Sequence, residues 1–290
     1  MAFFDLRSFI FNNDRISNVY KGLLNVLCVY IFYSLISILV RVYHFHDTKS
    51  ITDWIYSILS FQANGYSWYV NMYIGIFLLI LFLNLIFNGL NTRKERHILI
   101  LTFLLLSGVP NFVNVLPVLI NESRILYFPD WWAGIYPLTY FFIGCYIREY
   151  RPKVNKPFAL LSFVFIILVE TFLCYYYSDN GPFVDAVGYY GPLMIIASSV
   201  LFFIIFYDID IKNKVLSSIF GTLGGLTLDI FLASFISDLL VYEYIRNNVF
   251  ESQFQIIYYF VPIIGTILMI SIAMSLIRKY STWLLKCNSS

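Results

Sequence analysis

Charge is scarce in this sequence. Only 12% of its 290 residues are Asp, Glu, Lys or Arg, whereas 60% are hydrophobic. A soluble domain of this length could not cover so much apolar surface with so few charged groups. The net charge of +2 is also too small to indicate nucleic acid as a partner. The composition therefore predicts an integral membrane protein whose main partner is the lipid bilayer.

The short motifs of several enzyme classes are missing as well. The sequence has no P-loop, no GxSxG, no HExxH and no dinucleotide-binding fingerprint. Its four cysteines form no CxxC pair, so we interpret three as small core residues and Cys287 as a thiol of the tail. His44 and His46 form an HxH pair, but two ligands in one loop are weak support for zinc. We expect no metal site and no bound cofactor.

Long apolar runs dominate the chain. A helix needs about 20 mostly apolar residues to cross the hydrocarbon core, which is roughly 30 Å thick. Such runs are found near residues 22–41, 69–89, 98–117, 131–148, 157–177, 189–207, 216–242 and 255–278. The connections are short and contain no Gly/Ser/Pro-rich linker. The sequence therefore predicts an all-α fold, a polytopic membrane helix bundle of about eight transmembrane helices that forms one integral membrane domain over residues 1–290.

The basic residues of the connections indicate an orientation, because Lys and Arg are retained on the cytoplasmic side. With the eight runs as spans, fifteen Lys and Arg fall on one side of the membrane and four on the other. This split predicts a multi-pass protein of the cell inner or plasma membrane with both termini in the cytoplasm. The opening residues mix charges into an aromatic run and lack a small-residue cleavage site, so we expect no removable signal peptide.

One connection on the predicted outer side has a helical pattern of its own. Residues 51–62 carry Ile51, Ile55, Ile58 and Leu59 at helical spacing, in a stretch too short to span the membrane. We predict a helix lying in the membrane interface. It either roofs a cavity or is an ordinary amphipathic connector.

Three carboxylates lie inside the predicted spans, where an ionisable side chain is costly unless it is paired or hydrated. Glu170 lies in the fifth run, and Asp229 and Asp238 lie nine residues apart in the seventh, on opposite faces of a helix. Neither Glu170 nor Asp229 has an evident Lys or Arg partner within the membrane, so a protonated form suits each. Both are interpreted either as buried hydrogen-bond acceptors or as groups for proton transfer or substrate binding. Asp238, nearer the outer boundary, is interpreted as hydrated.

Polar and aromatic residues open the second run. Trp68, Tyr69, Asn71 and Tyr73 precede a long apolar stretch. An aromatic belt at the membrane boundary accounts for Trp68 and Tyr69, but it does not require an amide further in. Trp68 and Asn71 share one helical stripe, which we expect to face the bundle. These four residues are therefore candidates for one wall of a substrate pocket, together with Glu170 and Asp229.

Three stretches resemble a known family. They are Tyr66–Asn84, Phe128–Tyr150 and Leu226–Tyr242. In this order they are similar to the membrane acyltransferase-three family, which includes bacterial enzymes that O-acetylate surface polysaccharides. The resemblance implies a bundle of about ten spanning helices. It also implies transfer of an acyl group, usually acetyl from acetyl-CoA on the cytoplasmic side, to a sugar hydroxyl of a glycan or lipid-linked sugar acceptor.

The sequence departs from the family in two places. The family's first helix carries an arginine and then the essential histidine, and no helix of this chain has that pattern; its opening resembles the approach to the family's third helix. The chain thus lacks the family's N-terminal helical hairpin, and the catalytic residues stay unassigned. Where the family has paired arginines that help to hold the donor, this chain has Arg15 and Lys21, which become the candidate donor-binding residues.

Three functions remain open at this stage. The first is an O-acyltransferase of a cell-envelope polysaccharide. The second is a non-catalytic membrane protein of polysaccharide assembly that keeps a glycan pocket. The third is a small transporter, suggested by Glu170, Asp229 and the prolines within the spans.

Overall fold

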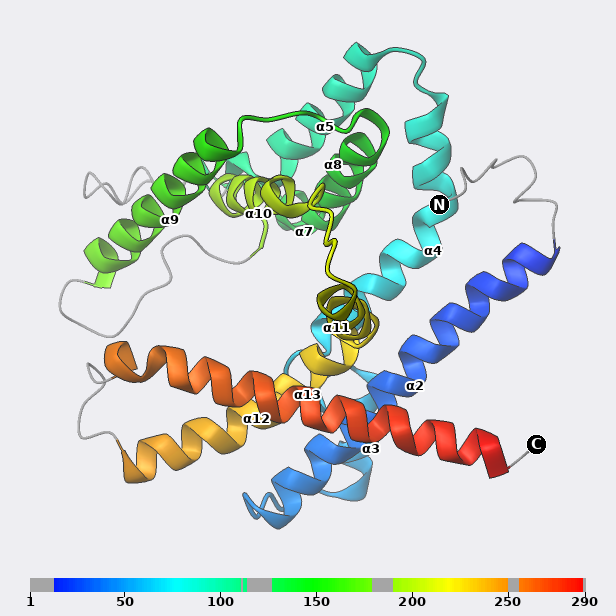
Figure 1. Ribbon diagram of the computed structural model, residues 1–290, viewed down its shortest axis with the longest axis vertical. Helices are drawn as coiled ribbons and strands as arrows, with labels where there is room; N and C mark the ends of the chain where they lie inside the picture. Colours follow the sequence, from blue (N-terminus) through cyan, green and yellow to red (C-terminus); the bar gives the residue numbers. More distant parts are fainter. Residues whose placement is uncertain (1–12, 111, 114–126, 179–189, 250–255, 289–290) are drawn as a thin grey trace. The chain divides into compact units, whose positions relative to one another are not determined.

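The computed structural model describes residues 13–110, 112–113, 127–178, 190–249 and 256–288 (Figure 1). These residues belong to two compact units. The first unit comprises residues 1–78 and 211–290, and the second comprises residues 79–210. Helices account for the regular structure of both units, so the predicted all-α fold class is confirmed for the described residues.

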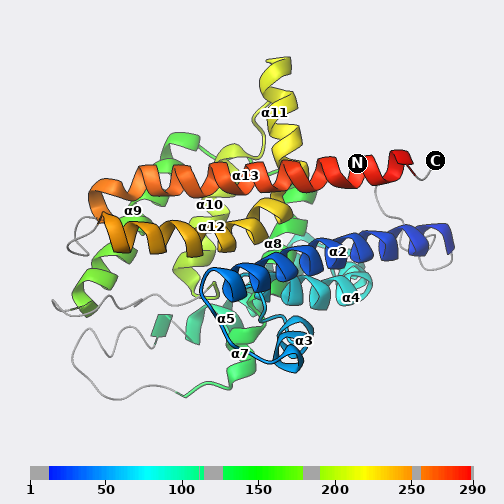
Figure 2. The same ribbon diagram turned by 90° about the horizontal axis from the view of Figure 1, so that it is seen from below.

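The first unit is built from long helices contributed by both ends of the chain. They are α2 (Asn13–Tyr43), α3 (Ile51–Leu59), the opening turns of α4 (Trp68–Gly89), α11 (Lys214–Gly225), α12 (Thr227–Asn248) and α13 (Ile256–Asn288). Helices α12 and α13 pack against each other; they lie side by side in Figure 2 and cross at an angle in Figure 1. Helix α2 packs against α12, so the amino-terminal helix is joined to the carboxyl-terminal pair.

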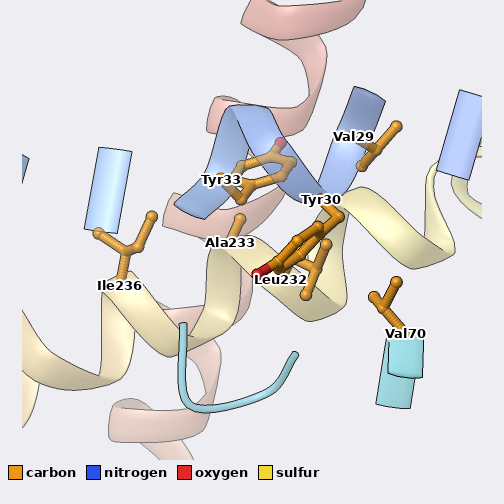
Figure 3. Close-up of a cluster of buried hydrophobic side chains, with 7 residues drawn as sticks. All are labelled: Val29, Tyr30, Tyr33, Val70, Leu232, Ala233 and Ile236. Atoms are coloured by element: carbon orange, nitrogen blue, oxygen red, sulfur yellow. The ribbon is translucent and has the colours of Figure 1, made fainter. Parts of the chain in front are cut away.

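The core of the first unit lies where α2 crosses α12. Its buried side chains are Val29, Tyr30, Tyr33, Val70, Leu232, Ala233 and Ile236. Figure 3 shows the α12 side chains facing those of α2, with Val70 of α4 beside them. The residues on each helix recur at the spacing of one helical face, which accounts for a continuous apolar seam. Ala233 is small enough to let the two helix backbones approach closely.

Polar side chains join the same helices inside this unit. Ser237 of α12 and Ser271 of α13 are both fully buried, and their hydroxyl oxygens lie 3.0 Å apart. Each hydroxyl also lies within hydrogen-bond distance of the carbonyl four residues earlier on its own helix, so one of the two donates across the interface and the other donates along its helix. Such small polar contacts are typical of helix interfaces in membranes, where apolar burial alone gives little drive for association.

Helix α3 forms in the connection where the sequence predicts a short interfacial helix. A capping box begins it: Ser50 accepts from the Asp53 backbone, and Asp53 accepts from the Ser50 backbone. Hydrogen bonds from Ser50 hold the pKa of the Asp53 carboxyl below its ordinary value. On its inner side Trp54 is buried, and the Tyr30 hydroxyl donates to the Ile58 carbonyl at 2.5 Å. The predicted helix is confirmed, and its role as roof or connector stays open.

The second unit contains two helix pairs. Its elements are the end of α4, α5 (Arg93–Ser107), α7 (Asp130–Gly134), α8 (Tyr136–Tyr150), α9 (Lys156–Ser178) and α10 (Leu193–Phe206). Helices α5 and α8 pack together around Phe142, which is fully buried against Phe87 and Phe103. Helices α9 and α10 form the other pair, with Phe163 against Phe202.

Four described helices are long and apolar enough to cross a membrane. They cover Gly22–Tyr43, Trp68–Gly89, Lys156–Tyr176 and Tyr258–Ser281. Helices α11 and α12 together would make a fifth, but they bend by 69° at Leu226. Within the predicted span over residues 216–242 the helix is therefore broken rather than straight, because it weakens at the adjacent glycines, and the Thr227 hydroxyl donates to the Gly224 carbonyl. The count of eight spans stays a prediction.

Candidate functional site

The break at Leu226 places Asp229 in the first turn of α12. A carboxylate is favourable there, because the unpaired N–H groups at the start of a helix carry partial positive charge. Arg278 of α13 binds it in a two-pronged contact: Nε reaches Oδ1, and Nη2 donates to Oδ2 at 2.9 Å. Asp229 is only 4% exposed, and the fully buried Tyr33 of α2 lies close to the pair.

This contact corrects one prediction. Asp229 was expected to lack a basic partner and to suit a protonated form, whereas its two oxygens face one guanidinium. Arg278 was counted with the cytoplasmic connection, because the last apolar run ends there. Helix α13 in fact continues to Asn288, which turns Arg278 into a helical residue that faces α12. A bidentate arginine contact is a charge-assisted one of fixed geometry.

The second carboxylate of α12, Asp238, meets the segment that joins α3 to α4. The Tyr66 hydroxyl donates a short hydrogen bond to Asp238 Oδ2. Among the described residues, Oδ1 of Asp238 makes no hydrogen bond. Asp238 was interpreted from the sequence as a hydrated group near the boundary; the structure gives it a tyrosine partner 172 positions away in the chain.

Asn64 holds the segment that presents Tyr66. Its buried amide nitrogen donates to Ser37 Oγ at 3.1 Å and to the Leu232 carbonyl at 2.9 Å. Its amide oxygen accepts from the Tyr66 backbone at 3.0 Å. One side chain therefore ties α2, α12 and the segment together. A Cβ on the neighbouring Gly65 would overlap the Phe235 ring, so the segment can approach Phe235 of α12 this closely only because residue 65 is a glycine.

Aromatic rings surround the Tyr66–Asp238 contact. We call Tyr66, Trp68, Tyr69, Phe231 and Phe235 the aromatic cluster. Tyr66 stacks on Phe231 with 5.3 Å between ring centroids, and Tyr69 meets Phe231 edge-on at 5.2 Å. Trp68 lies 6.0 Å from Tyr69, and Phe235 lies 5.5 Å from Tyr66. Tyr69 is 38% exposed, so ring surface of the cluster stays accessible.

The guanidinium of Arg41 covers the Phe235 ring at 5.6 Å from its centroid. A cation is thereby held at the edge of the aromatic cluster, since aromatic ring faces attract positive charge. The cluster thus combines stacking surface, one carboxylate and one cation within a single unit.

The predicted pocket residues divide between this cluster and other places. Trp68 and Tyr69 belong to it. Asn71 is exposed, and Tyr73 is exposed and contacts Phe77 of its own helix; the inward-facing stripe with Asn71 stays a prediction. Glu170 lies on α9 in the second unit.

The donor-binding candidates fall at the start of α2. Arg15 and Lys21 lie in its opening turns, and their side chains are outside the described part of the structure.

Several residues of the site were not found from the sequence. Tyr66, Asn64 and Arg278 belong to segments that were interpreted as connections, and Phe231 and Phe235 lie in an apolar run from which they were not singled out. One signal was available: Phe231, Phe235 and Asp238 recur at positions i, i+4 and i+7, which places them on one helical face.

The two histidines of the HxH pair have different surroundings. His44 Nε2 lies 2.6 Å from a carboxylate oxygen of Glu243, and His46 sits in a left-handed backbone conformation with φ of 54°. Among the described residues, no three His, Cys, Asp or Glu side chains lie close enough together to hold a metal ion.

Comparison with known protein families gives one match, which extends over most of the chain. Residues 4–278 match a family model described as an acyltransferase domain. Among curated proteins and solved structures, none matches the chain. The match includes residues of both units, so it does not single out either of them.

Proposed function

The chain belongs to the membrane acyltransferase-three family, whose model covers residues 4–278, and we propose that it moves an acetyl group from acetyl-CoA to a sugar hydroxyl of a cell-surface polysaccharide. In the reaction the acceptor oxygen forms a bond to the acyl carbon, and the bond from that carbon to the coenzyme sulfur breaks. The proton lost by the hydroxyl is balanced by the proton that the coenzyme thiolate takes up. The acceptor must therefore be held with one hydroxyl aimed at the thioester.

The aromatic cluster with Asp238 carries this proposal, because it suits a sugar acceptor. A pyranose ring presents an apolar C–H face, which stacks on aromatic rings, and an edge of hydroxyl groups. Asp238 Oδ2 accepts from Tyr66, which leaves Oδ1 to accept from a sugar hydroxyl, while the exposed ring of Tyr69 adds stacking surface to the same cluster. Hydrogen bonds to a carboxylate are among the strong ones, so Asp238 would orient the acceptor.

The other two functions make different demands. A non-catalytic protein of polysaccharide assembly would use the same aromatic cluster to bind a glycan without transferring an acyl group. A transporter would use an intramembrane carboxylate that changes its charge. Asp229, one of the two carboxylates that suggested a transporter, is held by Arg278 in an ion pair.

The test is acetyl transfer by the purified chain in lipid nanodiscs. Acetyl-CoA labelled in its acetyl group is supplied with polysaccharide extracted from the host surface, and ester-bound label is counted. Transfer that falls about 100-fold in Asp238→Asn supports the proposal, since a lost charge-assisted contact of this kind costs about 2–3 kcal/mol. The exposed Asp210→Asn is the matched control and should transfer at the rate of the unmodified chain.

Binding of the polysaccharide without transfer would replace the proposal with the non-catalytic function. Equal transfer by Asp238→Asn and Asp210→Asn would keep the acyltransferase but remove Asp238 from the acceptor site.

A further inference from the structure

Basic and aromatic side chains gather in the second unit where α5 begins and α8 ends. We call Arg93, Arg96, His97, Tyr146 and Tyr150 the basic–aromatic cluster. The Tyr146 hydroxyl accepts from Arg93 Nε at 2.8 Å and lies 2.7 Å from His97 Nε2. One hydroxyl therefore holds a guanidinium and an imidazole next to each other.

Aromatic rings, rather than acids, position Arg93. Its guanidinium carbon lies 5.0 Å from the ring centroid of Tyr150 and 5.6 Å from that of Tyr146. Within the described residues Arg93 makes no ion pair, and neither its two terminal nitrogens nor Nδ1 of His97 makes a hydrogen bond. Both side chains are exposed. Their donors are therefore fixed in direction, and the charge of Arg93 is not neutralised by a carboxylate.

Arg96 is the mostly buried arginine of the cluster. Its side chain is 13% exposed, donates to the Tyr150 hydroxyl at 2.9 Å and to the Leu90 carbonyl at 3.2 Å, and lies over the Phe87 ring. Its Nε is buried, and in the described part of the chain it has no hydrogen-bond partner. A buried donor of this kind calls for an explanation, and a bound ligand or water is the usual one.

The nearby acids leave the cluster positive. Glu149 is 3.4 Å from Arg96 Nη1, a long contact for an ion pair. Glu95 belongs to the capping box of α5: backbone N–H groups of Thr92 and Asn91 donate to it and hold the pKa of its carboxyl below the ordinary value. Lys94 and Arg148, both exposed, add two further cations at the same helix ends.

From this geometry we infer that the basic–aromatic cluster binds a phosphate group of an anionic ligand. An arginine fork matches phosphate oxygens, the imidazole adds a donor, and the tyrosine rings offer a face for a planar base. Two sources share this chemistry: the phosphates of coenzyme A and the headgroup of an anionic lipid. Both are found on the cytoplasmic side, where the positive-inside pattern predicts these residues to lie. In its coenzyme form the inference rests on the proposed function, and in its lipid form it does not.

Direct binding tests the inference without any transfer reaction. The whole protein is placed in phosphatidylcholine nanodiscs and titrated with coenzyme A and with 3′-dephospho-coenzyme A. In a second arm, native mass spectrometry counts phosphatidylglycerol molecules retained by the protein from mixed-lipid nanodiscs. The variant Arg93→Gln/His97→Gln removes the two exposed donors, and Lys153→Gln, at an exposed position beyond α8, is the control for lost charge.

We expect the double variant to bind one of the two anions about tenfold more weakly than Lys153→Gln, since the loss of charged phosphate contacts is of this order. Arg93→Lys, which keeps the charge without the fork, should fall between them. Loss confined to coenzyme A identifies the donor as the source, and loss confined to phosphatidylglycerol identifies the lipid. Equal binding of both anions by the double variant and the control, or no binding by the unmodified protein, overturns the inference. A protein that binds coenzyme A through this cluster but transfers no acetyl group would refute the proposed function alone.

Discussion

Arg278 of α13 donates two hydrogen bonds, from two guanidinium nitrogens, to the carboxylate of Asp229 in the first turn of α12. The contact ties together the two helices that pack most extensively in the first unit. It also accounts for a charge in a segment predicted to lie in the membrane, because a buried carboxylate is tolerated when it is paired.

Removing either partner should destabilise the first unit. We expect Arg278→Gln to lower the free energy of unfolding by about 3 kcal/mol, because Asp229 is left buried and uncompensated. The double variant Asp229→Asn/Arg278→Gln should lose less than the sum of the two single changes. Steric trapping in bicelles measures the free energies. Arg246→Gln, at an exposed position of α12, is the control, and a loss as small as that of Arg246→Gln would contradict the role of the pair.

Asn64 should be needed for the shape of the site. Its three hydrogen bonds link α2, α12 and the Tyr66 backbone. We expect Asn64→Ala to cost about 2 kcal/mol or more of unfolding free energy, because buried partners lose their hydrogen bonds. Asn71→Ala changes the same side-chain type at an exposed position of α4 and should be nearly neutral. Equal stability of the two variants, by the same unfolding assay, would show that the Asn64 contacts are dispensable.

Gly65 should not tolerate a methyl group. A Cβ there would overlap the ring of Phe235, which is held between Tyr66 and Arg41. We expect Gly65→Ala to destabilise by about 1–3 kcal/mol, the usual range for overpacking, and a second change, Phe235→Leu, to restore part of the loss. Gly75→Ala has open space around its Cβ and serves as the control. If Phe235→Leu restores none of the stability lost in Gly65→Ala, overlap with the Phe235 ring is not the cause of that loss.

The ion pair between Lys156 and Asp208 predicts a pH dependence in the second unit. The hydrogen bond from Lys156, at 2.5 Å, holds the pKa of the Asp208 carboxyl below its ordinary value. A carboxyl with a lowered folded-state pKa contributes stability above its ordinary pKa and loses it as the pH falls through the lowered value. We therefore expect Asp208→Asn to be less stable than the unmodified protein at neutral pH and equal to it in strong acid. Thermal unfolding at a series of pH values measures this, and a difference that persists in acid would contradict it. Asp210→Asn should leave the profile unchanged.

The fold class could be predicted from hydrophobic runs alone. Each predicted run overlaps a described helix, because apolar length is a strong signal in membrane proteins. The interruption at Leu226 could not be placed, since the glycines before it also suit close helix packing. Likewise the end of α13 was missed: Arg278 and Lys279 suggested a connection, whereas the helix continues beyond them.

The site was predicted only in part, for a physical reason. Trp68 and Tyr69 could be found because they stand out at the start of an apolar helix. Their neighbours could not, because Tyr66 and Phe231 are distant in sequence and only the packing of α12 against the α3–α4 connection brings them together. Asp229 likewise meets Arg278 only because α12 packs against α13, and sequence spacing does not reveal which helices pack together.

The most direct test of the acceptor site is a kinetic comparison of Asp238→Asn and Tyr66→Phe with Tyr43→Phe, whose side chain is 76% exposed. Acetyl transfer is measured with the concentrations of polysaccharide and acetyl-CoA varied separately. If Asp238 and Tyr66 hold the sugar, both substitutions raise the KM for the polysaccharide by about tenfold or more and leave the KM for acetyl-CoA unchanged, while Tyr43→Phe changes neither. An unchanged KM for the polysaccharide in Asp238→Asn would contradict the account.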